Sequence, residues 1–268
     1  TVFSLNPYVS YHGQYERQIG LLTFIYLFLV YYFSPQVFNS EKRIKQTVFI
    51  IEITAVIVAV YAIIQDAGLD PFDIQPVADK RPVSTLGNSV FAGGFMALVL
   101  PFSLLNVSGK RKVLLKVLFP LMILTGIIVT KTRSAYLAVI IELIILSLTY
   151  LLVFRNTTEE SRKKYRNIFI AIIIFVAVIF LFFVFFPGNP YVSRLTSVIF
   201  SENNPRWILW QDSFNIFKKY PITGPGIAMF PSAFEEFYSV RLRSEDVLRF
   251  ADNPHNNFFQ VLYTMGIL

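Results

Sequence analysis

The sequence has no cysteine and only two histidines. Without cysteine, the chain has no disulfide framework and no thiolate metal site. The two histidines, His12 and His255, stand far apart, and neither an HExxH motif nor an Asp-x-Asp pair accompanies them. Zinc and other catalytic metals need ligand sets that such a sequence does not offer. We therefore expect metal-independent chemistry that uses no cofactor.

Charge is also scarce. Charged residues make up 15% of the 268 residues, whereas hydrophobic residues make up 54%. A soluble domain of this length needs more polar surface, so the composition predicts a polytopic membrane protein. The net charge of +7 would suit a nucleic-acid partner. Most basic residues, however, fall in short loops between apolar runs, where membrane topology explains them, and we expect no nucleic-acid binding.

Six apolar segments approach the roughly 20 residues that a helix needs to cross the bilayer core. Lipid offers no partner to unpaired backbone groups, so each is predicted to be a helix. The segments are residues 18–33, 47–64, 89–107, 113–130, 135–154 and 167–186, with a partial seventh from Asn257 onward.

The predicted fold is all-α, with three parts. A polytopic membrane helix bundle spans residues 1–186, a long and partly helical extracytoplasmic loop spans 187–256, and residues 257–268 start a seventh span. No signal peptide is recognisable at the beginning. We expect the chain to be a fragment that lacks spans at both ends.

Lysine and arginine in the short loops set the predicted orientation. The loops at 34–46, 108–112 and 155–166 carry 11 of these residues, against five in the short segments on the other side. The positive-inside rule therefore places the first set in the cytoplasm. Residues 65–88 and the long loop then lie outside the cytoplasmic membrane.

Two carboxylates fall inside predicted spans. Buried acids in a membrane are costly, so Glu52 and Glu142 each raise a functional hypothesis. For Glu52 an ion pair with Lys116 is an equally good structural alternative. Glu142 has no evident partner and is left out of the predicted site. Near the outer end of the third span, Gly93 and Gly94 favour close helix packing over room for a lipid tail.

A short external turn, Lys131-Thr132-Arg133-Ser134, joins the fourth and fifth spans. Thr132 or Ser134 can cap the fifth helix, whose N-terminus then carries a partial positive charge and unpaired N–H groups. A guanidinium beside such a helix end suits phosphate, so Arg133 is a candidate phosphate ligand. The alternative is contact with lipid headgroups.

In the long loop, Asn204-Pro205 predicts a helix start and Tyr220-Pro221 its end. The aromatic residues of this helix recur at helical spacing and favour an anchor at the membrane interface over a sugar platform. They are Trp207, Trp210, Phe214 and Phe217. Arg206, in the first turn, is a second candidate phosphate ligand. Gly224-Pro225-Gly226 predicts a turn that passes closely over another segment.

The chain returns to the membrane at residues 252–257, where Pro254 can start the seventh helix and place His255 in its first turn. The residues alone favour a capping or interface role for His255 over a catalytic one.

Several motifs, in this order and spacing, resemble the O-antigen ligase and polymerase superfamily of bacterial envelope enzymes over about residues 86–268. They are Gly87-Asn88, Thr132-Arg133-Ser134, Arg206-x-x-x-Trp210, Pro221-x-x-Gly224-x-Gly226, His255-Asn256 and Met265-Gly266-Ile267-Leu268.

The resemblance implies a multi-pass glycosyltransferase of the bacterial cytoplasmic membrane. Its donor would be a glycan on a polyprenyl (undecaprenyl) diphosphate carrier, and its acceptor a glycan, lipid or protein outside that membrane. By this likeness Arg133 and Arg206 bind the diphosphate and His255 is the general base. Ligase, polymerase and protein O-glycosyltransferase are not separated.

A non-catalytic transporter or flippase of lipid-linked glycans is the alternative from another class. Such proteins combine paired broken helices near mid-membrane with inverted repeats. The sequence shows neither.

Overall fold

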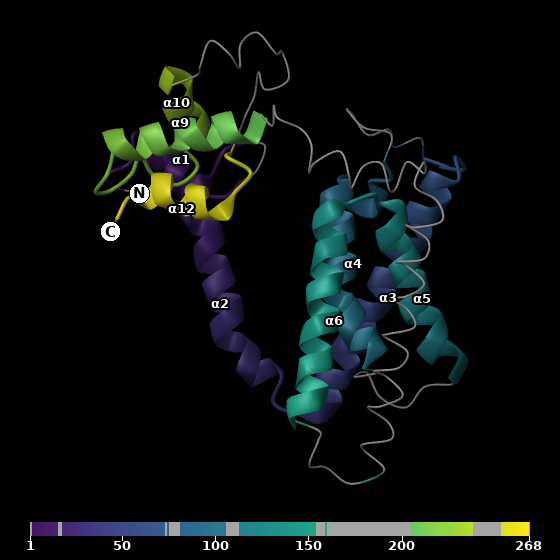
Figure 1. Cartoon of the computed structure of the whole chain (residues 1–268). Coiled ribbons are helices and arrows are strands. Elements are labelled where there is room, and N and C mark those ends of the chain that lie inside the picture. Colours follow the sequence, from purple (N-terminus) through teal and green to yellow (C-terminus); the bar gives the residue numbers. More distant parts are fainter. Residues whose placement is uncertain are drawn as a thin grey trace. The chain divides into compact units, whose positions relative to one another are not determined.

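The computed structural model describes residues 2–15, 18–72, 74, 81–105, 113–153, 159, 205–237 and 253–267. Within these ranges every regular element is a helix, which confirms the all-α prediction (Figure 1). The chain divides into two compact units. The first unit is Thr1–Val37 with Ser201–Leu268, and the second unit is Phe38–Phe200. The boundaries predicted at residues 186 and 256 stay a prediction.

Within the described residues, the second unit contains four long helices and one short 3-10 turn. They are α3 (Glu41–Asp66), η1 (Ser84–Leu86), α4 (Ser89–Leu104), α5 (Val113–Val129) and α6 (Arg133–Val153). These helices agree with four of the predicted segments to within a few residues. Asn88 caps α4, because its side chain accepts a hydrogen bond from the Val90 N–H over 2.8 Å. The predicted segment 167–186 lies outside the described residues.

Small residues let the helices of the second unit pack closely. A Cβ atom on Gly126 of α5 would lie 2.6 Å from Ala59 Cβ of α3 and 2.6 Å from Met96 Sδ of α4. A Cβ atom on Gly93 would lie 2.9 Å from Thr130 Oγ1. The predicted close packing therefore holds at Gly93, whereas a Cβ atom on Gly94 would meet no heavy atom within 4 Å.

Helix α3 is the one helix in the described ranges whose length and composition both suit a membrane crossing. It has 26 residues, and the apolar helices α2 (Leu21–Val37), α4 and residues 115–129 of α5 are shorter. Glu52 lies in α3 and has no exposed surface, whereas Lys116 in α5 is exposed. The described structure therefore does not support the suggested Glu52–Lys116 ion pair.

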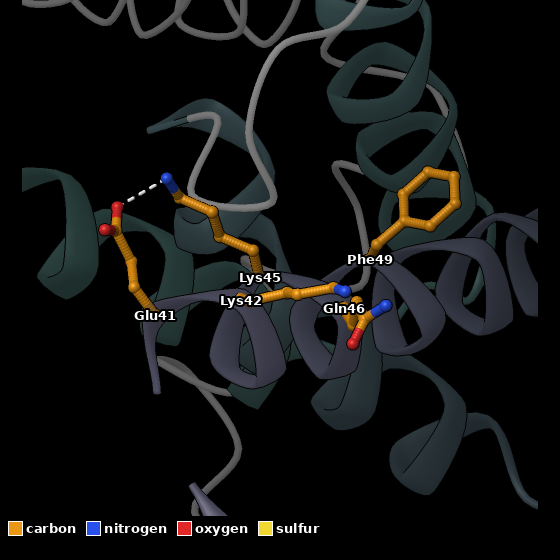
Figure 2. A pocket seen from close by; sticks show the side chains of 5 residues that line it. All are labelled: Glu41, Lys42, Lys45, Gln46 and Phe49. Atoms are coloured by element: carbon orange, nitrogen blue, oxygen red, sulfur yellow. Dashed lines mark hydrogen bonds and ion pairs between the residues drawn. The ribbon is translucent and has the colours of Figure 1, made fainter. Parts of the chain in front are cut away.

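A hollow of about 390 Å³ lies along the first turns of α3 (Figure 2). Its lining residues are Glu41, Lys42, Lys45, Gln46 and Phe49. The Lys45 ammonium is paired with the Glu41 carboxylate across one helical turn. This hollow is at the opposite end of α3 from Asp66 and contains none of the predicted site residues.

The first unit contains α1 (Pro7–His12), α2 (Leu21–Val37), α9 (Pro205–Lys219), α10 (Phe230–Phe237) and α12 (Asn257–Met265). Helix α9 begins and ends where the sequence predicts. Helix α9 packs against α10 and α12. The buried residues of this hydrophobic cluster are Leu209, Ile216, Phe230, Ala233, Phe234 and Tyr263. Phe230 is central, with its ring stacked on Phe234 and 4.9 Å from the ring of Tyr263.

Candidate functional site

The predicted short turn is present between α5 and α6, and its outward orientation stays a prediction. Three residues connect these helices, because α5 ends at Val129 and α6 begins at Arg133. Lys131 has φ 51°, in the left-handed region that few non-glycine residues adopt. Arg133 is half-buried and is the first residue of α6, next to the unpaired N–H groups of that helix end.

Side-chain hydrogen bonds hold this turn against the surrounding helices. The buried Thr132 hydroxyl donates to the Ser89 carbonyl at the start of α4 over 3.0 Å. The Tyr136 hydroxyl donates to the Ile128 carbonyl over 2.6 Å. The turn therefore has contacts on both sides of Lys131, and the backbone position of Arg133 is well constrained.

Lys131 has a role that the sequence analysis missed. Its Nζ atom lies 2.9 Å from Asp66 Oδ1 at the end of α3, in a part-buried ion pair. The pairing offsets the Lys131 charge, and Arg133 stays the phosphate candidate that the sequence predicts in this turn. Asp66 and Lys131 both belong to predicted outer segments, but nothing in the sequence links them.

Helices α9 and α12 lie side by side in the first unit and run in the same direction (Figure 1). At one end, the Trp210 indole N–H donates to the Pro254 carbonyl over 3.0 Å, and the Trp210 ring stacks on Phe259. At the other end, the Ile267 N–H donates to the Pro221 carbonyl over 3.0 Å. The N-termini of both helices therefore lie at the same end of the unit.

This alignment places the first turn of α9 and the segment before α12 at the same end of the unit. Arg206 precedes Trp210 by four residues, which is about one helical turn. His255 directly follows Pro254, the residue that accepts the Trp210 hydrogen bond. The backbone of Arg206 and the segment of His255 therefore both lie toward the N-terminal end of the helix pair, and the closeness of the two side chains stays a prediction. The side chain of Arg206 lies outside the described residues, as do Arg194, Arg241, Arg243 and Arg249.

The segment before α12 has a defined turn geometry. The Asn253 side chain accepts a hydrogen bond from the His255 N–H over 2.7 Å, and His255 has φ 51°. The Asn256 side chain accepts from the Phe258 and Phe259 N–H groups and caps α12. The helix thus begins at Asn257, and the prediction that Pro254 starts it was wrong. Exposed His255 lies just before the helix cap instead of in the first turn.

The glycine turn Gly224-Pro225-Gly226 passes closely over other segments, as predicted. A Cβ atom on Gly224 would lie 2.2 Å from the Thr264 carbonyl oxygen of α12. The Gly226 N–H donates to the same oxygen over 3.2 Å. This turn therefore fixes the C-terminal end of α12 against the segment that follows α9.

Arg133 belongs to the second unit, whereas Arg206 and His255 belong to the first. Their convergence on one cavity stays a prediction.

Apolar helices that pack closely through small residues are typical of membrane proteins. A family model described as O-antigen ligase matches residues 117–268, more than half of the chain. The chain belongs to the O-antigen ligase family, a glycosyltransferase-like class of bacterial inner-membrane proteins. The matched residues include Arg133, Arg206 and His255. No curated protein matches the chain, and no solved structure does.

Proposed function

We propose that this chain carries the catalytic groups of a glycosyltransferase that moves a glycan from a polyprenyl diphosphate carrier, such as undecaprenyl diphosphate, to an acceptor. Transfer takes place on the extracytoplasmic side of the inner membrane, in a multi-pass protein. Arg133 and Arg206 bind the diphosphate, and His255 is the general base. In this proposal guanidinium groups, instead of a metal ion, neutralise the leaving group.

The reaction is a displacement at the anomeric carbon of the glycan. The acceptor hydroxyl oxygen forms a bond to that carbon, while the bond from the carbon to the diphosphate oxygen breaks. The bonding electron pair leaves with polyprenyl diphosphate. The hydroxyl proton passes to the neutral imidazole of His255, which then releases it to water. An imidazole titrates near neutral pH, so it can both accept and release this proton.

The observation that supports the proposal most is the parallel pairing of α9 and α12. In this pairing Trp210, one helical turn after Arg206, donates to the Pro254 carbonyl directly before His255. The negative charge of the diphosphate grows as the sugar bond breaks, and two helix N-termini with a guanidinium would stabilise it. The base and one anion-binding group thus come from two segments that are about 50 residues apart in the sequence.

Arg133 supports the proposal from the second unit. It begins α6, and its turn is held by the Thr132 and Lys131 contacts. A guanidinium at a helix N-terminus binds the two oxygens of a phosphate in one plane. The proposal requires both units to face one donor molecule.

The decisive experiment measures covalent transfer by the full-length protein in inner-membrane vesicles. The donor is the host's own undecaprenyl-diphosphate-linked glycan, and transfer is followed by mass spectrometry of the acceptor. Arg133→Ala, Arg206→Ala and His255→Asn should each lower the transfer rate by about 10²-fold or more. Asn is chosen at position 255 because it tolerates the left-handed backbone there.

Matched controls are Arg43→Ala and His12→Ala, which remove an exposed arginine and the second histidine. Both should transfer glycan at the wild-type rate. Normal transfer by all three site variants would reject the proposed site. Passage of glycan across the membrane without a new covalent bond would instead favour the transporter or flippase.

A further inference from the structure

The outer end of α3 is joined to the turn that precedes Arg133. Asp66 is the last residue of α3, and its carboxylate lies 2.9 Å from the Lys131 ammonium. The two side chains are 17% and 19% exposed, so this pair is more withdrawn from solvent than the Glu41–Lys45 pair at the start of the same helix. Removal of one partner would leave the other charge uncompensated in a partly buried place.

The Asp66–Lys131 ion pair also balances a negative charge at the C-terminus of α3. A helix C-terminus carries a partial negative charge, so an acidic residue there is unfavourable unless a cation balances it. Lys131 supplies that cation across a separation of 65 residues. Because Lys131 also adopts a left-handed backbone, the ion pair helps to keep the turn in a conformation that its residue type disfavours.

The segment that carries Asp66 is itself fixed by hydrogen bonds. The Asp70 carboxylate accepts from the Tyr61 hydroxyl over 2.7 Å and from the Gln65 amide over 2.9 Å. The Gln65 side-chain oxygen in turn accepts from the Ser84 N–H over 2.7 Å. These hydrogen bonds fix the C-terminal end of α3, so the position of Asp66 can constrain the turn that contains Lys131.

We infer that Asp66 is a positioning residue for donor binding, which acts through Lys131 to hold Arg133 toward the diphosphate. The inference rests on the proposed function of Arg133. Without Asp66, the turn would relax and Arg133 would be held less firmly toward the diphosphate. A shift of about 1 Å in a positioning group can lower a rate by up to about 10²-fold.

The test is a double-mutant cycle in the vesicle assay, with undecaprenyl-diphosphate-linked glycan as donor. Asp66→Asn should raise KM for this donor and lower kcat/KM by about tenfold, with little change in kcat. In an Arg133→Ala background, the same change should have almost no further effect, because it acts through Arg133. The charge swap of Asp66→Lys with Lys131→Asp should restore most of the lost transfer.

The control is Glu41→Gln, which breaks the ion pair at the other end of α3 (Figure 2). It should leave KM unchanged. Two results would overturn the inference: losses that multiply in the double variant, or a charge swap that restores no transfer. The proposed function would still stand if Arg133→Ala and His255→Asn had lost transfer. Wild-type transfer by Arg133→Ala would overturn both. Protease protection checks that each variant inserts normally.

Discussion

The indole N–H of Trp210 donates to the carbonyl oxygen of Pro254 over 3.0 Å. This bond joins the first turns of α9 to the residue directly before His255. The same indole ring stacks on Phe259 of α12, with centroids 5.6 Å apart. Trp210 therefore aligns the two segments on which the proposed base and one proposed diphosphate ligand depend.

Trp210→Phe tests this alignment. The substitution keeps an aromatic ring against Phe259 but removes the donor to Pro254. A hydrogen bond contributes about 0.5–1.5 kcal/mol net, so we expect transfer to fall roughly 2- to 10-fold. Trp207→Phe is the control, because Trp207 is 66% exposed and should tolerate the change. Equal rates for the two variants in the vesicle assay would contradict the prediction.

Gly224→Ala should destabilise the first unit. Gly224 has φ 62°, and a Cβ atom there would lie 2.2 Å from the Thr264 carbonyl oxygen. Gly68 has φ 73° with no heavy atom within 4 Å of a Cβ atom, so Gly68→Ala shows the backbone strain alone, about 1–2 kcal/mol. We expect a clearly larger fall in melting temperature for Gly224→Ala.

The measurement for Gly224→Ala is thermal unfolding followed by tryptophan fluorescence. Both tryptophans of the chain, Trp207 and Trp210, lie in α9, so this signal reports on the first unit. Circular dichroism provides the comparison for Gly68→Ala. A Gly224→Ala protein that unfolds at the wild-type temperature would show that the turn is not held against α12.

Asp70 predicts a pH dependence of stability. Burial raises the pKa of Asp70, but hydrogen bonds from Gln65, Tyr61 and two backbone N–H groups outweigh it and lower the pKa below the usual 3.8. A carboxylate with a lowered pKa stabilises the folded state at neutral pH, and this contribution is lost as pH falls through the folded-state pKa.

Asp70→Asn should therefore lower the melting temperature at pH 7, and the difference from wild type should shrink below about pH 4. Thermal unfolding in detergent over pH 3 to 7 measures this. A constant difference across that range would show that the Asp70 charge has no part in stability.

Local signals in the sequence predicted much of the fold. Asn88 and Pro205 mark the beginnings of α4 and α9, because capping side chains and N-terminal proline act within one turn. The proline signal at Pro254 predicts the start of α12 three residues too early. Asn256 was the better signal, because its side chain accepts from two N–H groups of the first turn.

Contacts between residues that are far apart in the sequence could not be predicted from it. The Asp66–Lys131 pair and the Trp210–Pro254 bond each join residues more than 40 positions apart. Charge and aromatic content predict that such residues lie on one side of a membrane, but not which of them meet. The parallel course of α9 and α12 likewise depends on tertiary packing of Phe230 and Tyr263, not on periodicity.

Helix α3, with 26 residues, is about 39 Å long, whereas the hydrocarbon layer is about 30 Å thick. If it stands across the bilayer, its terminal ion pairs emerge among the headgroups of opposite leaflets. The diphosphate of an isoprenoid carrier resides at the same depth. In the proposed reaction, the donor would then meet Arg133 without being lifted out of its leaflet, and only the sugar would have to enter water.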